Sequence, residues 1–66
     1  MKLQKIKLEI AMARACMSAR DLRREGLSPA TISRAVHGEE LTVKTVGKIA
    51  RALGVDVAEI IEEVKQ

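Results

Sequence analysis

Apolar residues recur along the chain in short blocks that glycine and capping residues separate, a pattern that predicts several short amphipathic helices. The first block covers residues 5–17. Apolar and charged side chains alternate over residues 6–10, which also suits a strand, but the strong helix formers that follow favour a helix enclosed by its neighbours. We expect Cys16 and Met17 to end this helix inside the core, since free cysteine is usually a small buried residue. Residues 1–4 are expected to be extended or frayed.

The second block is short and holds few apolar residues. Ser18 is an N-cap candidate, because its hydroxyl can accept a hydrogen bond from a free N–H group of the first helical turn. The helix that it opens covers residues 19–25, with Ala19 and Leu22 facing inward. Gly26 then supplies the left-handed residue at which many helices end.

The third block begins two residues later and has two very different faces. Ser28 is a second N-cap, Pro29 suits the first helical position, and Gly38 ends the segment, so this helix covers residues 28–37. One face is apolar, whereas the other carries small or hydrogen-bonding side chains and no carboxylate. The residues of this outer face are Ala30, Ser33, Arg34 and His37. Two helices joined by a turn of about three residues that contains Gly predict a helix-turn-helix.

Two more blocks complete the chain. Thr42 can cap a helix that ends at Gly54, and Leu41 can pack against Val46 to fix the angle at which the chain enters it. A capping box then predicts a last short helix. Its capping residues are Asp56 and Glu59, and its apolar residues are Val57, Ile60, Ile61 and Val64. The pattern as a whole predicts a compact all-α domain over residues 1–66, with five helices and no strands.

Composition narrows the possible functions. A single Cys and a single His cannot complete a zinc site, and the lack of a second Cys favours a reducing, cytoplasmic setting. The absence of Phe, Tyr and Trp removes the stacking platforms that single-strand binders use. No apolar run approaches the roughly 20 residues of a membrane span, and the N-terminus has no signal-peptide core. Because no nucleophile–base set or phosphate-binding Gly loop is present, we do not expect an enzyme.

The charge is unevenly distributed. Residues 1–51 hold eleven Lys/Arg against five Asp/Glu, a net of +6, whereas residues 52–66 hold one against four, a net of −3. The acidic end would face away from any polyanion that the rest of the chain binds. Since the missing aromatic residues argue against single-strand binding, double-stranded DNA or a protein remains possible as the partner.

The motifs together resemble a known family. They are Met17-Ser18 leading into Leu22, then Gly26-Leu27-Ser28, then the run from Ala30 to Arg34, then Gly38, and the run from Lys44 to Val55. Over about residues 5–62 this combination is similar to the Cro and lambda-repressor (XRE) family of helix-turn-helix DNA-binding domains. The resemblance implies a lambda-repressor-like fold in which the second and third helices form the helix-turn-helix.

The resemblance also implies which residues contact DNA. Ala30, Ser33 and Arg34 are expected to meet bases, with Arg34 able to bond guanine O6 and N7 together and the methyl group of Thr31 able to touch thymine. Because Pro29 and Ala30 are short, base reading would depend mainly on Arg34. Phosphate contacts are expected from Ser18 with the amide of Ala19, from Ser28 and from Lys44. His37 is either a further, pH-dependent phosphate contact or a solvated side chain.

These expectations define a function and one alternative. The chain is expected to be a sequence-specific regulator of the Cro or small-repressor kind that binds the major groove of double-stranded DNA, with no cofactor, metal or small-molecule ligand. A homodimer on DNA is expected, since one such helix reads too few base pairs. The alternative is a protein-interaction module on the same fold, coactivator or antitoxin-like, that uses the acidic and apolar C-terminal helix.

Overall fold

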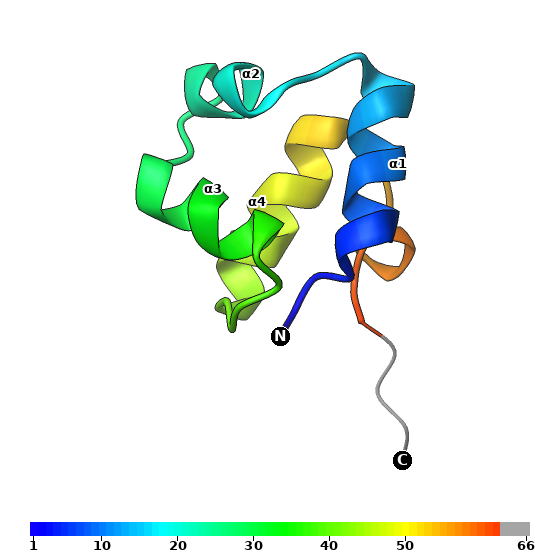
Figure 1. Cartoon of the computed structure of the whole chain (residues 1–66), viewed down its shortest axis with the longest axis vertical. Coiled ribbons are helices and arrows are strands. Elements are labelled where there is room, and N and C mark those ends of the chain that lie inside the picture. The colour runs from blue at the N-terminus through cyan, green and yellow to red at the C-terminus, as the bar shows by residue number, and fades with distance from the viewer. Residues whose placement is uncertain (63–66) are drawn as a thin grey trace.

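The computed structural model describes residues 1–62. Within this part the chain forms four α-helices and one turn of 3-10 helix. In order these are α1 (Lys5–Ala15), α2 (Ala19–Arg24), α3 (Pro29–Val36), α4 (Val43–Leu53) and η1 (Val57–Glu59). Figure 1 shows α2 and α3 on one flank of the molecule, α1 on the other, and α4 running between them. None of the described helices is long and apolar enough to cross a bilayer.

The predicted N-caps stand where the helices begin. The Ser28 hydroxyl accepts a hydrogen bond from the Thr31 N–H at 3.2 Å. In the same way the Thr42 hydroxyl accepts one from the Thr45 N–H at 3.2 Å. Each supplies an acceptor that the first turn of a helix lacks. Ser18 is the N-cap of α2, so these three predicted helix starts are confirmed, but its hydroxyl donates to Asp21 and does not accept the expected hydrogen bond from the first turn.

Two left-handed residues show how the helices end. Gly26 has a φ of 97°, and the N–H of the next residue, Leu27, turns back to the Leu22 carbonyl at 3.3 Å. Helix α1 ends in the same way, but on Cys16, whose φ is 54°. The prediction that Cys16 lies in the core is wrong, since its side chain is exposed. In this type of cap the residue after the left-handed position makes the apolar contact, and Met17 packs against the core accordingly.

The core is apolar throughout the described residues. Its members come from the four α-helices and the segments beside them, whereas η1 contributes none, and they are Leu3, Leu8, Ala11, Leu22, Leu27, Ile32, Ala35, Leu41, Val46, Ile49, Ala50, Leu53 and Ile60. Two sequence-based expectations about it are wrong. Ala19 is exposed, which leaves Leu22 as the buried residue of α2. On α1, Ile6 and Ile10 are 62% and 48% exposed, because α3, α4 and η1 pack against the face that carries Leu8 and Ala11.

The N-terminal segment is extended, as predicted, but it is not frayed. Leu3 is only 2% exposed. The backbone on either side of it is held by distant parts of the chain. The Leu41 N–H donates to the Met1 carbonyl at 2.7 Å, and the Glu62 N–H donates to the Lys2 carbonyl at 2.9 Å. The first residues therefore belong to the folded domain.

The predicted fifth helix is reduced to the single turn η1. Asp56 and Glu59 do form a capping box, in which the Asp56 N–H donates to the Glu59 carboxylate at 2.9 Å. Beyond this turn, however, Ile60 is fully buried and its carbonyl accepts a hydrogen bond from the N-terminal segment. Ile61 forms an isolated β-bridge with the same segment. The prediction of five helices is wrong because this backbone bonds to the N-terminal segment and not to a further helical turn; Val64 lies outside the described residues.

Candidate nucleic-acid interface

Helix α3 divides into a buried face and an exposed face, as the sequence predicts. Ile32 and Ala35 are buried. The exposed residues of the helix and its C-cap are Ala30, Ser33, Arg34 and His37, together with Pro29 at its first position. Arg34 forms no ion pair with any described residue, so its guanidinium is available to a ligand. The exposed face therefore presents hydrogen-bonding groups and a free cation without a neutralising carboxylate.

The first turn of α3 is capped by hydroxyl groups alone. The Ser28 hydroxyl donates to the Thr31 hydroxyl at 2.9 Å and also accepts the Thr31 N–H. Pro29 has no N–H, and the first turn contains no acidic residue. The amide of Ala30 makes no hydrogen bond within residues 1–62. Because a helix start carries a partial positive charge, this free amide and the two hydroxyls form a place suited to an anion.

The start of α2 is different, because the chain supplies its own anion there. The Ser18 N–H and the Ser18 hydroxyl both donate to the Asp21 carboxylate, at 2.8 and 3.0 Å. These hydrogen bonds, first that of the backbone N–H, together with nearby Arg24 and Arg20, lower the pKa of Asp21 below its usual value. A phosphate at the predicted Ser18 position would have to compete with this carboxylate. The neighbouring amides of Ala19 and Arg20 are left without an acceptor among the described residues.

His37 continues the exposed face past the end of α3. Its Nδ1 lies 2.7 Å from the Ser33 carbonyl oxygen and 3.5 Å from the Ser33 hydroxyl. Because a carbonyl oxygen only accepts, Nδ1 carries the proton in this arrangement. The ring is therefore fixed to the backbone of α3, and Nε2 is the nitrogen left for an outside partner.

Helix α4 begins in the same way as α3. The Thr42 hydroxyl donates to the Thr45 hydroxyl at 2.8 Å, and the first turn contains no acidic residue. Lys44 is exposed in this first turn and has no ion-pair partner within residues 1–62. The nearest carboxylate along the chain, that of Glu40, pairs instead with the Met1 ammonium at 3.1 Å. The predicted phosphate contact at Lys44 thus has an open, positively charged setting.

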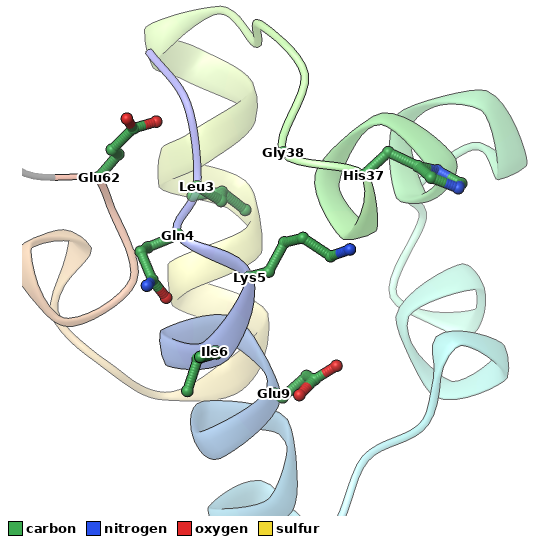
Figure 2. Close-up of a pocket in the computed structure, with 8 residues that line it drawn as sticks. All are labelled: Leu3, Gln4, Lys5, Ile6, Glu9, His37, Gly38 and Glu62. Atoms are coloured by element: carbon green, nitrogen blue, oxygen red, sulfur yellow. The ribbon is translucent and has the colours of Figure 1, made fainter.

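An open hollow of about 620 Å³ lies where the start of α1 meets the end of α3. Figure 2 shows the Lys5 side chain extending beside Gly38, while the His37 ring points away from α1. The charged residues of the rim have both signs and are Lys5, Glu9 and Glu62. No buried polar side chain points into the hollow from the described residues. Nor do any three His, Cys, Asp or Glu side chains of residues 1–62 gather as they would to hold a metal.

The comparison with protein families agrees with this geometry. The model of the Cro/C1-type HTH DNA-binding domain matches residues 7–66. The chain belongs to this family. The predicted resemblance is therefore confirmed over nearly the whole chain, and at family level the protein is a DNA-binding transcription regulator. No curated protein and no solved structure matches the chain.

In this Cro/C1-type domain the predicted contact residues lie on the surface, with Thr31 half-buried. They come from α2, α3 and the start of α4, and α2 packs directly against α3. Sequence reasoning did not identify Asp21 as the partner of Ser18, although a carboxylate three residues after an N-cap is the known signal for such a bond. It also left out Lys5, which reaches the end of α3 only because the fold brings α1 there.

Proposed function

We propose that this Cro/C1-type domain is a sequence-specific regulator of the small-repressor kind that reads the major groove of double-stranded DNA with α3. The observation that supports this proposal most strongly is the outer face of α3, which is exposed, free of carboxylates and flanked by an open helix start. A helix about 10–12 Å across fits a major groove about 12 Å wide.

Base recognition is assigned to three residues of that face. Arg34 is exposed and has no ion-pair partner among the described residues, so it can bond both acceptors of a guanine. Ser33 can pair with several bases and adds little discrimination. Ala30, with the methyl group of Thr31, offers apolar contact to a thymine methyl group. Specificity per monomer therefore depends mainly on Arg34.

Phosphate contacts are assigned to the helix starts that carry no acid. Ser28 and the free amide of Ala30 would hold one phosphate at the start of α3. Lys44 would hold another at the start of α4, and His37 would add a contact through Nε2 when its ring is protonated. At the start of α2 the proposal retains only the amide of Ala19, because Asp21 already occupies Ser18.

Two copies are proposed to bind one operator. A single α3 reads only a few base pairs, whereas two copies related by a two-fold axis would read half-sites about one helical turn apart. Analytical ultracentrifugation with and without a selected duplex tests this. Two chains per duplex are expected, and a single chain on an asymmetric half-site would contradict it.

The function itself is tested by selection from random duplex DNA, followed by fluorescence titrations at two salt concentrations. Enrichment of a defined sequence and salt-sensitive binding are expected. Arg34→Ala should remove the preference at one base pair, a loss of about 1–3 kcal/mol of discrimination. Arg14→Ala is the matched control: Arg14 lies on α1, is mostly exposed and pairs with Glu59 at 3.6 Å, and its loss should leave the selected sequence unchanged.

The alternative, a protein-interaction module, now rests on a different surface. The apolar residues that were expected to serve it are mostly built into the fold, with Ile60 fully buried and Ile61 half-buried. The exposed large apolar residues of the described part are instead Met1, Ile6, Ile10 and Val43, and of these Ile6 and Ile10 lie one helical turn apart on α1. Two results together would favour this alternative over DNA reading. The wild type would bind all duplexes weakly and equally, and a variant with both Ile6→Ser and Ile10→Ser would lose a protein partner that the wild type binds.

A further inference from the structure

The outer face of α4 carries a row of three cations, of which the assigned contacts use only the first, Lys44. Lys44, Lys48 and Arg51 are spaced i, i+4 and i+7, so they lie along one side of the helix, and all three are exposed. We call these three residues the basic row. At a rise of 1.5 Å per residue the basic row extends over roughly 10 Å.

The charges of the basic row are not neutralised within the described part of the chain. None of the three forms an ion pair with residues 1–62. One acidic residue, Glu25, lines a hollow with Lys48 and Arg51 but lies beyond ion-pair distance of both. Three uncompensated cations on one short helix create a local positive potential.

The surface between these cations is concave. Gly47 stands among them, and together they line an open hollow of about 290 Å³. A Cβ atom built on Gly47 would meet no atom within 4 Å, so nothing fills the space above its backbone. A tetrahedral anion can therefore approach the helix closely, with cationic side chains around it.

The two ends of the basic row adjoin the proposed DNA interface. Lys44 lies in the first turn of α4, where a phosphate contact is already assigned. At the other end Lys48 and Arg51 line a hollow with Gly26 and Leu27, the turn residues directly before Ser28. The row thus joins the start of α4 to the start of the reading helix.

We propose that Lys48 and Arg51 extend the contact of Lys44 into a binding surface for consecutive phosphates of one DNA strand, outside the base pairs that α3 reads. This rests on the proposed function, since it requires α3 to lie in the groove. The length is sufficient for more than one phosphate, since one strand has a phosphate for about every 3.4 Å of helix axis and the basic row extends over roughly 10 Å. An acidic protein segment could bind the same charges. It would not explain, however, why the basic row adjoins the proposed DNA contacts at Lys44 and Ser28.

The salt dependence of binding to the selected duplex tests this proposal. Each lost phosphate contact lowers the slope of log K against log salt by about 0.9. Lys48→Gln and Arg51→Gln should each show this change, the double variant should show about twice as much, and base preference should be retained in all of them. Arg14→Gln, which removes one exposed charge from α1, should leave the slope as in the wild type.

The outcomes separate the two proposals. The wild type could select a sequence while Lys48→Gln and Arg51→Gln show the same slope of log K against log salt as Arg14→Gln. In that case the phosphate surface is disproved and the proposed function stands. Loss of preference at one base pair in either variant would equally overturn a phosphate-only role. If the wild type binds all duplexes with equal weakness, the proposed function fails and this inference fails with it.

Discussion

The two helices of the helix-turn-helix begin with the same residue type in opposite electrostatic states. At the start of α2, Ser18 donates both its N–H and its hydroxyl to Asp21, so the positive end of the helix is occupied by a carboxylate of the chain. At the start of α3, the Ser28 hydroxyl is bonded only to Thr31, and no acid lies in the first turn. The start of α2 is neutralised, and the start of α3 is open to an anion.

We infer from this difference that a serine N-cap alone is not enough for a phosphate site. The residue three positions later matters as well, because an acid there binds the same donors that a phosphate would need. By this criterion α4 resembles α3, since Thr42 is followed by Thr45 and not by an acid. The phosphate contacts should therefore concentrate at α3 and α4.

The largest effect is expected when the start of α3 is converted into a copy of the start of α2. In Thr31→Asp the new carboxylate can accept from Ser28, so the urea midpoint should be unchanged or slightly higher. Because the carboxylate faces phosphates and base edges, affinity for the selected duplex should fall roughly 100-fold, as like charges at an interface cost several kcal/mol. Unchanged affinity in a fluorescence titration would show that α3 does not enter the groove.

A smaller loss is expected from the same change at α4. Thr45→Asp places a carboxylate beside a phosphate contact but away from the bases, so affinity should fall roughly tenfold with base preference retained. Competition titrations with single-base variants of the duplex measure both quantities. A change in base preference would argue against a purely phosphate-binding role for this helix start.

A gain is expected from opening the start of α2. Asp21→Asn removes the carboxylate next to Ser18, so affinity should rise a few-fold and more so at low salt. The urea midpoint should fall, because the neutral amide is a weaker acceptor for the two Ser18 donors. Lower affinity in this variant would mean that the carboxylate orients α2 for binding and does not merely exclude a phosphate.

The smallest effect concerns pH. Folding lowers the pKa of Asp21, so its contribution to stability is complete above the usual pKa of an aspartate and is lost as the pH falls through the lower, folded value. Urea midpoints of the wild type and Asp21→Asn should therefore differ at pH 6 and converge toward pH 2. A difference that persists at pH 2 would show that Asp21 acts by some means other than its charge.

The helix starts and the reading face could be predicted from the sequence because they depend on local chemistry. Ser28, Thr42 and Gly26 act within one turn of their own position, and neighbouring residues decide what they do. The helical spacing of the apolar residues in α3 likewise predicts the correct buried face. This local information is sufficient to place the helix-turn-helix and to identify Arg34 as an exposed cation.

The remaining errors share a physical cause, which is that the deciding partner is distant in sequence. The chain beyond η1 is extended because Lys2 and its neighbours lie beside it, and no local signal announces this pairing. Ile6 and Ile10 fit a buried pattern but face outward, because only the tertiary packing determines which side of α1 is covered. The basic row is visible in the sequence as a spacing, yet its position beside Gly26 and Leu27 requires the fold.

The most direct test of the DNA-reading role is an NMR titration of the ¹⁵N-labelled chain with the selected duplex. The account predicts that the largest amide shifts fall at Ala30 to Arg34 and around Lys44, with smaller shifts at Ser18, whose donors Asp21 already occupies. Shifts confined to the exposed face of α1 around Ile6 and Ile10, with α3 unaffected, would contradict it.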